Sequence, residues 1–185
     1  VLRVSDIVRE WKRGGREGGR AELLRRLAIN GGCYVPSLYD VEYLEDGRIR
    51  RVAPNAPDIP WRVAKHTVMD LDAWPYPKAP LVPLAETVHE RASVEIFRGC
   101  TRGCRFCQAG MITRPVRERS LATVGAMVQQ AVQASGFEEV GLLSLSSADH
   151  TEIQAIAKSL ADRYEGENIG LSLPSTRVDA FNIDL

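Results

Sequence analysis

Residues 94–111, V-E-I-F-R-G-C-T-R-G-C-R-F-C-Q-A-G-M, decide how the rest of this 185-residue chain is interpreted. Cys100, Cys104 and Cys107 are separated by three and then two residues, and the chain has one other cysteine. A structural zinc site uses four ligands, usually two pairs from separate turns, and no second pair is present. Thiolates on one tight loop are typical of an iron-sulfur cluster, and three of them leave one iron of a cubic cluster open. The spacing therefore favours a reactive iron-sulfur site.

Other interpretations of these thiols stay open on the residues alone. A zinc knuckle could be completed by His89 or His150, and an electron-transfer cluster could be completed by Cys33. Cys33 lies in an unrelated segment, and an isolated cysteine commonly behaves as a small, partly buried apolar residue. A non-catalytic iron-sulfur or zinc-binding module is therefore the alternative function.

The C-x-x-x-C-x-x-C order, with Phe106 directly before the last cysteine and a predicted strand before the first, resembles the radical SAM superfamily. The resemblance implies that Cys100, Cys104 and Cys107 bind a 4Fe-4S cluster whose open iron is chelated by S-adenosylmethionine. It also implies reductive cleavage of S-adenosylmethionine to a 5'-deoxyadenosyl radical, with Phe106 packed beside the adenine. A reductant such as flavodoxin or ferredoxin is the implied electron donor, and the substrate is not indicated.

The longer phrase R-G-C-T-R-G-C-R-F-C-Q-A-G-M-I, followed by R-P-V-R-E-R-S, is similar to a branch of that superfamily with a cobalamin-binding-like domain ahead of its barrel. The resemblance implies that residues 1–88 are the linker and tail of such a domain, and that residues 89–185 are the N-terminal half of the barrel. Cobalamin is accordingly a candidate cofactor, although the chain lacks the D-x-H-x-x-G pattern that ligates cobalt. The other domains of a longer chain are the implied partners.

Strands and helices are predicted to alternate after residue 92. The predicted strands are residues 93–97, 139–145 and 169–173. Ser120 is predicted to cap the first intervening helix. The apolar stripe of that helix comprises Val124, Met127, Val128 and Ala131. This order predicts a parallel α/β unit, which the resemblance identifies as the first three strand-helix units of a partial TIM-like (β/α) barrel.

The resemblance also implies cofactor contacts after the second and third strands. The family usually has a Gly-Gly-Glu-like turn after the second strand to hold the amino group of S-adenosylmethionine. The same position here has Ser146, Ser147 and Asp149, whose oxygens can accept from an ammonium, although helix capping explains Asp149 equally well. Ser175 and Arg177 follow the third strand, where a barrel offers donors to the carboxylate or ribose.

The residues before the cysteines predict short helices, a hairpin and a proline-rich linker. Helices are predicted for residues 1–11, with Ser5 and Asp6 as candidate caps, and for residues 22–29, ended by Asn30, Gly31 and Gly32. Alternating runs at 39–44 and 48–52 flank Asp46-Gly47, a strong hairpin signal. Residues 62–68 resemble a strand, and Trp74 and Tyr76 are expected to pack the linker onto the barrel.

The composition, with 44% hydrophobic and 26% charged residues, predicts a globular protein. No apolar run approaches the roughly 18 residues of a membrane span, and no signal peptide is recognisable, so we expect a cytoplasmic location. A net charge of zero gives no argument for binding nucleic acid or membranes. Of the arginines between positions 98 and 119, Arg98 or Arg102 is expected near the cluster and the others in solvent. Because the chain begins with Val1 and stops within a strand-helix series, we expect it to be an enzyme fragment that is inactive alone.

Overall fold

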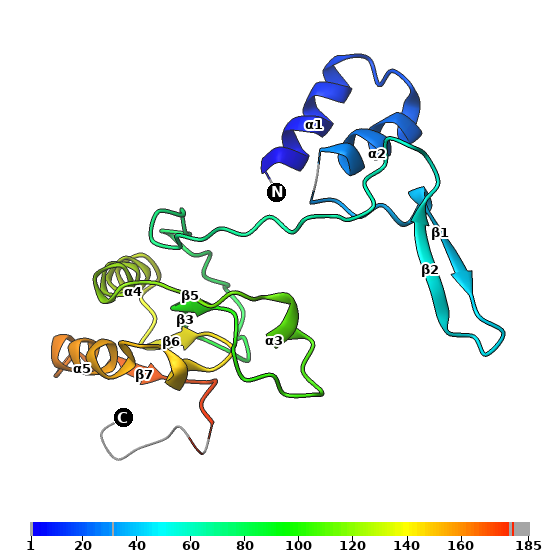
Figure 1. Cartoon of the computed structure of the whole chain (residues 1–185). Helices are drawn as coiled ribbons and strands as arrows, with labels where there is room; N and C mark the ends of the chain where they lie inside the picture. Colours follow the sequence, from blue (N-terminus) through cyan, green and yellow to red (C-terminus); the bar gives the residue numbers. More distant parts are fainter. Residues whose placement is uncertain (1, 31, 178, 180–185) are drawn as a thin grey trace. The chain divides into compact units, whose positions relative to one another are not determined.

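The computed structural model describes residues 2–30, 32–177 and 179. The chain divides into two compact units, Val1–Thr67 and Val68–Leu185. The first contains two helices and a hairpin, and the second contains a parallel sheet with helices on it (Figure 1). Among the described helices, none combines the length and apolarity needed to cross a membrane.

Two helices, α1 (Leu2–Arg13) and α2 (Gly19–Ile29), begin the first unit. Ser5 and Asp6 lie inside α1, so the expectation that they cap it was wrong. Gly15 and Gly18 in the connection have φ angles of 73° and 69°, which glycine adopts without steric strain. Residues 14–18 therefore connect the two helices, and Gly31 from the predicted stop signal lies outside the described residues.

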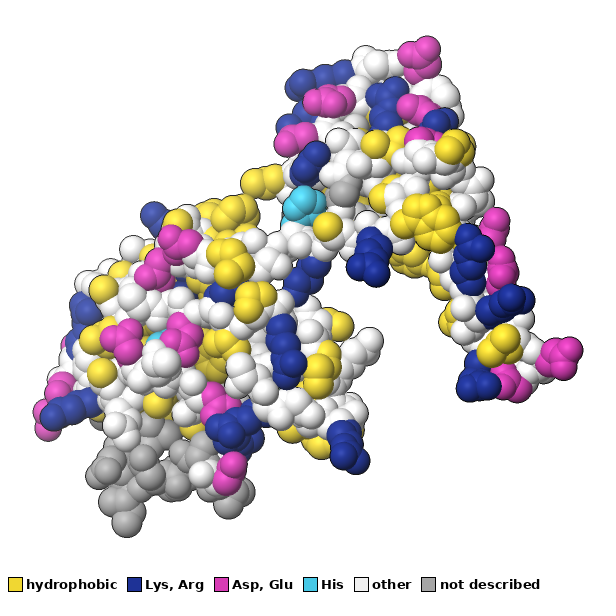
Figure 2. Space-filling view, viewed as in Figure 1, with side chains coloured by type: hydrophobic (Ala, Val, Ile, Leu, Met, Phe, Trp, Pro, Cys, Tyr) yellow, Lys and Arg dark blue, Asp and Glu magenta, His cyan; other side chains and the backbone are white. Residues whose placement is uncertain are grey.

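The predicted hairpin is present after the short helix η1 (Pro36–Leu38). Strand β1 (Tyr39–Tyr43) pairs antiparallel with β2 (Ile49–Pro54), and Gly47 in the turn has a φ of 82°. Basic and acidic side chains are interspersed along this hairpin on the face shown in Figure 2. The strand expected at residues 62–68 does not form, because this segment has no strand to pair with among the described residues.

The sheet of the second unit contains three parallel strands in the order β3-β6-β7: β3 (Ala92–Glu95), β6 (Glu139–Leu143) and β7 (Gly170–Ser172). Helix α4 (Leu121–Ser135) connects the first two, and α5 (Ile153–Arg163) connects the last two. Both helices lie side by side on one face of the sheet (Figure 1). These β-α units confirm the predicted α/β class and are consistent with part of a radical SAM barrel, while a helix after β7 would fall mostly outside the described residues.

The core of this unit lies between the helices and the sheet. All four predicted apolar residues of α4 are buried, and they pack with Val94 of β3 and Leu142 of β6. Full burial of one such side chain stabilises the fold by roughly 1.5–3 kcal/mol. The Ser120 hydroxyl caps α4 by accepting from the backbone N–H of Thr123 at 3.3 Å, and Gly136, with a φ of 70°, ends the helix. Local pattern and tertiary packing therefore agree along α4.

The proline-rich linker contacts this core through one of its two expected anchors. Tyr76 packs against the core cluster, and its hydroxyl donates to Gln130 Oε1 of α4 at 3.1 Å. Trp74 is 44% exposed. Tyr76 therefore fastens the linker to the helix layer.

Three short elements that the sequence did not predict surround the cysteines: β4 (Phe97–Arg98), α3 (Ala109–Ile112) and β5 (Arg117–Glu118). Strands β4 and β5 pair antiparallel, so the two stems of the cysteine segment lie next to each other. Arg117 donates to the carbonyl oxygens of Pro115, Val68 and Thr113 at 2.8–3.0 Å. Arg117 and Arg119 are 9% and 2% exposed, so the expectation that both lie in solvent was wrong. Both guanidinium groups are held inside because they donate to backbone carbonyls that lie outside the strands.

Candidate functional site

The cysteine loop leaves the C-terminal end of the first parallel strand and passes through β4. This is the edge at which parallel α/β barrels hold their reacting groups. Gly99, with a φ of 96°, starts the loop, and a Cβ at this position would lie 2.7 Å from the carbonyl oxygen of Pro115. Only glycine fits both this φ and this close approach.

The three predicted thiols share the loop but differ in surroundings. Cys100 and Cys107 are half-buried and Cys104 is exposed. The Cys107 Sγ accepts from the N–H of Gly110 at 3.3 Å, and the Cys100 Sγ accepts from the N–H of Arg102 at 3.5 Å. No group of three or more His, Cys, Asp or Glu side chains converges in metal-binding geometry within the described residues. The three thiols would therefore have to move closer together to bind one cluster.

The loop is tied to the edge of the sheet by ion pairs. Arg102 donates to both carboxylate oxygens of Asp149, at 2.5 and 3.0 Å, and Arg177 donates to Asp149 Oδ2 at 2.9 Å. Asp149 belongs to η2 (Ser147–Asp149), which follows β6. The Arg102 hydrogen bonds and the Arg177 charge lower the pKa of Asp149 to about 2. Asp149 therefore holds the cysteine loop beside the ends of β6 and β7.

The capping role that we allowed for Asp149 is excluded. Helix α5 begins at Ile153, its N-cap residue is Glu152, and no side chain caps it. Arg177 is equally engaged, since its Nε and Nη2 atoms donate to both oxygens of Asp179 at 2.8 and 3.2 Å. Each of these two predicted cofactor contacts is thus already part of the ion-pair network.

The serines of the turn after β6 are buried. Ser147 Oγ donates to the Leu142 carbonyl at 3.2 Å, and the Ser147 N–H donates to the Ser175 carbonyl at 2.8 Å, so the turn is joined to the end of β7. Ser146 is 2% exposed, and its Oγ has no hydrogen-bond partner among the described residues. The Ser146 hydroxyl also helps to lower the pKa of Asp149, although no hydrogen bond joins the two side chains. Ser146 therefore has hydrogen-bonding capacity to spare at this edge.

Phe106 projects from the loop and is 92% exposed. The structure thus brings Ser147, Asp149, Ser175 and Arg177 together at one edge of the sheet and leaves this ring on the surface. Such an exposed aromatic ring can stack on a planar ligand.

His150 does not complete a metal site here. Its Nε2 donates to the Arg119 carbonyl at 3.0 Å, and its Nδ1 accepts from the N–H of Glu152 at 3.0 Å. Both ring nitrogens are therefore used by the backbone, and the ring is 3% exposed. His89 is exposed, and Cys33 belongs to the other compact unit.

The sequence interpretation missed two residues that shape the loop. Arg114 donates to the carbonyl oxygens of Cys100 and Thr101 at 3.0 and 3.3 Å, which links the end of the loop to its start. Gly110 lies between two of the cysteines, because a Cβ there would be 3.6 Å from Cys107 Sγ and 3.8 Å from Cys100 Cβ. The glycines at positions 99 and 110 were the only local signal for this close packing.

Comparison with known protein families gives a match for the region that contains this site. Residues 94–185 match the family described as the radical SAM superfamily, so this region is a radical SAM domain with cysteines at positions 100, 104 and 107. No solved structure matches the chain. The resemblance drawn from the cysteine spacing is confirmed for this domain, and nothing in the matches supports the cobalamin-binding branch.

Two curated proteins are distantly similar to the chain. "Uncharacterized protein MJ0966" of Methanocaldococcus jannaschii is 29% identical over 163 residues, which cover 85% of this chain and 31% of that protein. "Ribosomal protein uS12 methylthiotransferase RimO" of Syntrophotalea carbinolica is 34% identical over 76 residues, which cover 41% of this chain and 14% of that protein. The chain thus spans less than a third of the length of these relatives.

Proposed function

We propose that this chain carries the cofactor-binding half of a radical SAM enzyme, in which Cys100, Cys104 and Cys107 hold a 4Fe-4S cluster and S-adenosylmethionine binds beside it. One observation carries the proposal: three thiols on one loop lie at the C-terminal end of the first parallel strand, inside the region that matches the family. When bound, the cluster supplies an electron to the sulfonium, which gives methionine and a 5'-deoxyadenosyl radical.

The residues present fit a thiolate-bound cluster in their chemistry. Two of the three sulfurs already accept backbone N–H groups, and hydrogen bonds to the sulfurs are a feature of iron-sulfur sites. Gly110 lies next to both Cys100 and Cys107, since a Cβ there would be in van der Waals contact with each of them. The exposed Cys104 is free of burial constraints and can turn toward the other two.

We propose two direct contacts with S-adenosylmethionine from this chain. The ring of Phe106 packs beside the adenine, and the Ser146 hydroxyl bonds the amino acid portion, since a buried hydroxyl without a partner is costly unless a ligand satisfies it. Ser147 and Ser175 shape the same turn through their mutual backbone bond. Asp149 and Arg177 position the loop through Arg102 and leave the cofactor contact to Ser146.

Residues 1–88 are proposed to connect this domain to further parts of a longer protein. The match to the M. jannaschii relative supports this, because it covers only 31% of that protein. A one-electron donor such as flavodoxin or ferredoxin is the proposed partner. We leave cobalamin out of the proposed cofactor set, because these residues and relatives give no support for it.

Anaerobic reconstitution of the chain with iron and sulfide tests the proposal. We expect this chain to hold one 4Fe-4S cluster whose electron paramagnetic resonance spectrum changes on addition of S-adenosylmethionine. Formation of 5'-deoxyadenosine under dithionite is expected from a full-length protein that contains this chain. Each of the variants Cys100→Ala, Cys104→Ala and Cys107→Ala is expected to lose all three signals, while Cys33→Ala retains them. Stoichiometric zinc without labile sulfide would instead support the non-catalytic module. Deoxyadenosine from Cys104→Ala at the parent rate would exclude this loop as the cluster site.

A further inference from the structure

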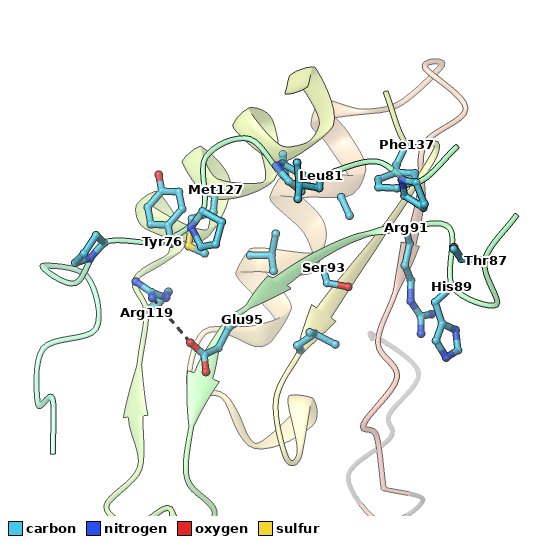
Figure 3. A pocket seen from close by; sticks show the side chains of 18 of the residues that line it. Tyr76, Leu81, Thr87, His89, Arg91, Ser93, Glu95, Arg119, Met127 and Phe137 are labelled. Carbon is cyan, nitrogen blue, oxygen red and sulfur yellow. Dashed lines mark ion pairs between the residues drawn. The ribbon is translucent and has the colours of Figure 1, made fainter. Parts of the chain in front are cut away.

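A cavity of about 430 Å³ lies in the second unit, between the proline-rich segment and β3 (Figure 3). None of the cysteine-loop residues 99–113 lines it, so it is distinct from the site described above. Its volume falls within the roughly 300–1,000 Å³ of small-molecule sites. The apolar part of its wall includes Tyr76, Leu81, Met127 and Phe137.

A buried cation points into this cavity. The Arg119 side chain is 2% exposed and extends from the end of β5 toward Glu95 (Figure 3). One terminal nitrogen donates to the Leu71 carbonyl, and the guanidinium lies 5.9 Å from the centroid of the Tyr76 ring. The Nε atom has no hydrogen-bond partner among the described residues. A guanidinium this deeply buried normally has its donors satisfied.

The nearest carboxylate does not neutralise Arg119 at close range. Arg119 Nη2 is 3.9 Å from Glu95 Oε2, whereas Arg98 binds both oxygens of Glu95 at 2.7 and 2.8 Å. The other guanidinium on the cavity wall, Arg91, bonds Glu139 and Ser172. Arg91 is thus paired with Glu139, and among the described lining residues Arg98 and Arg119 share one carboxylate, Glu95. A buried charge without a close counterion is strongly unfavourable, and an anion in the cavity would remove that imbalance.

We propose that this cavity binds a small organic carboxylate. Its carboxylate accepts from the Nε–H of Arg119, and its apolar portion packs against Tyr76 and Phe137. The mixture of apolar walls with one unsatisfied guanidinium favours this class over a bare inorganic anion, which would leave the apolar wall uncovered. The proposal stands on the cavity alone and does not depend on the cluster.

Benzoate, with benzamide as its neutral counterpart of the same shape, tests the charge requirement. In ¹H–¹⁵N spectra of the full chain, we expect saturable movement of the Arg119 Nε–H resonance with benzoate, and at least about tenfold weaker binding of benzamide. Acetate is expected to bind more weakly than benzoate, because it lacks the apolar ring. Equal binding of benzamide, no saturable benzoate binding, or binding of inorganic phosphate in preference to benzoate would overturn the proposal.

Two sets of variants locate the site. Arg119→Met is expected to weaken benzoate binding at least about tenfold, provided that circular dichroism shows a folded protein. Leu81 lines the cavity and is 99% exposed, so Leu81→Asp and Leu81→Asn should both fold. The added negative charge should make benzoate binding about twofold weaker in the aspartate variant than in the asparagine variant. Equal affinities in that pair, or unchanged affinity in folded Arg119→Met, would place benzoate elsewhere.

Discussion

Replacement of Asp149 by asparagine should destabilise the unit formed by residues 68–185 by about 2 kcal/mol at neutral pH. The pKa of Asp149 falls from its ordinary 3.8 to about 2, chiefly through the Arg102 hydrogen bonds, with smaller contributions from the Ser146 hydroxyl and the Arg177 charge. Each tenfold change in proton affinity corresponds to about 1.4 kcal/mol, which gives this magnitude for the charged form. The Asp149 side chain is 18% exposed, so solvent screens the pairs only in part.

Because the folded-state pKa is lowered, this stabilisation is fully present above pH 3.8 and is lost as the pH falls toward 2. The free-energy difference between the parent and Asp149→Asn should therefore be constant from pH 8 to 5 and narrow below pH 4. Urea unfolding followed through the methyl resonances of buried Leu142 reports on this unit. Asp162→Asn, at an exposed position of α5, is the matched control with no expected effect. A difference no larger than that of the control at pH 7 would refute the positioning role of Asp149.

Three further substitutions test the loop, the cofactor contact and the helix cap. Gly99→Ala should abolish cluster reconstitution, because the added Cβ would meet the Pro115 carbonyl. Gly125→Ala, inside α4 with open space around it, should instead stabilise the protein by roughly 0.5–1 kcal/mol in thermal unfolding. Phe106→Leu should weaken S-adenosylmethionine binding by about 0.5–1.5 kcal/mol in equilibrium titration while the iron content is unchanged, and loss of iron would contradict this. Ser120→Ala should lower the free energy of unfolding in urea by about 1 kcal/mol, because the α4 cap is lost. Ser159→Ala, on the exposed surface of α5, is the control and should cause no change. An equal effect of the two substitutions would argue against the cap.

The parts of the fold that follow from short-range patterns were predictable. The apolar stripe of α4, its Ser120 cap and the Asp46-Gly47 hairpin each depend on residues within a few positions of one another. The cysteine loop was recognised for the same reason, since its spacing is itself local. Periodicity, capping and turn chemistry act at this range, which explains the agreement.

The remaining features depend on contacts between distant residues. Asp149 was assigned equally to capping and to a cofactor because its partner Arg102 lies 47 positions away in the sequence. Arg119 was expected in solvent, yet it bonds Leu71, 48 positions away. The strand expected at residues 62–68 has a suitable composition but no pairing partner among the described strands. Such features depend on which residues become neighbours in the folded protein, and the type of a single residue does not predict those neighbours.

Two contacts join the ends of the cysteine loop: Gly99 lies against the Pro115 carbonyl, and Arg114 bonds the Cys100 carbonyl. This clasp also affects how the loop can capture a cofactor. Joining the ends of a 17-residue segment costs about 2.5 kcal/mol in chain entropy beyond a constant term. Because β4–β5 pairing and the bond from Arg114 to the Cys100 carbonyl already close the segment, that entropy is lost when the protein folds. Binding then does not have to close the segment. Substitutions that open the clasp should therefore weaken cluster retention even at positions that touch no ligand, because the entropy of closing the segment would then be lost on binding.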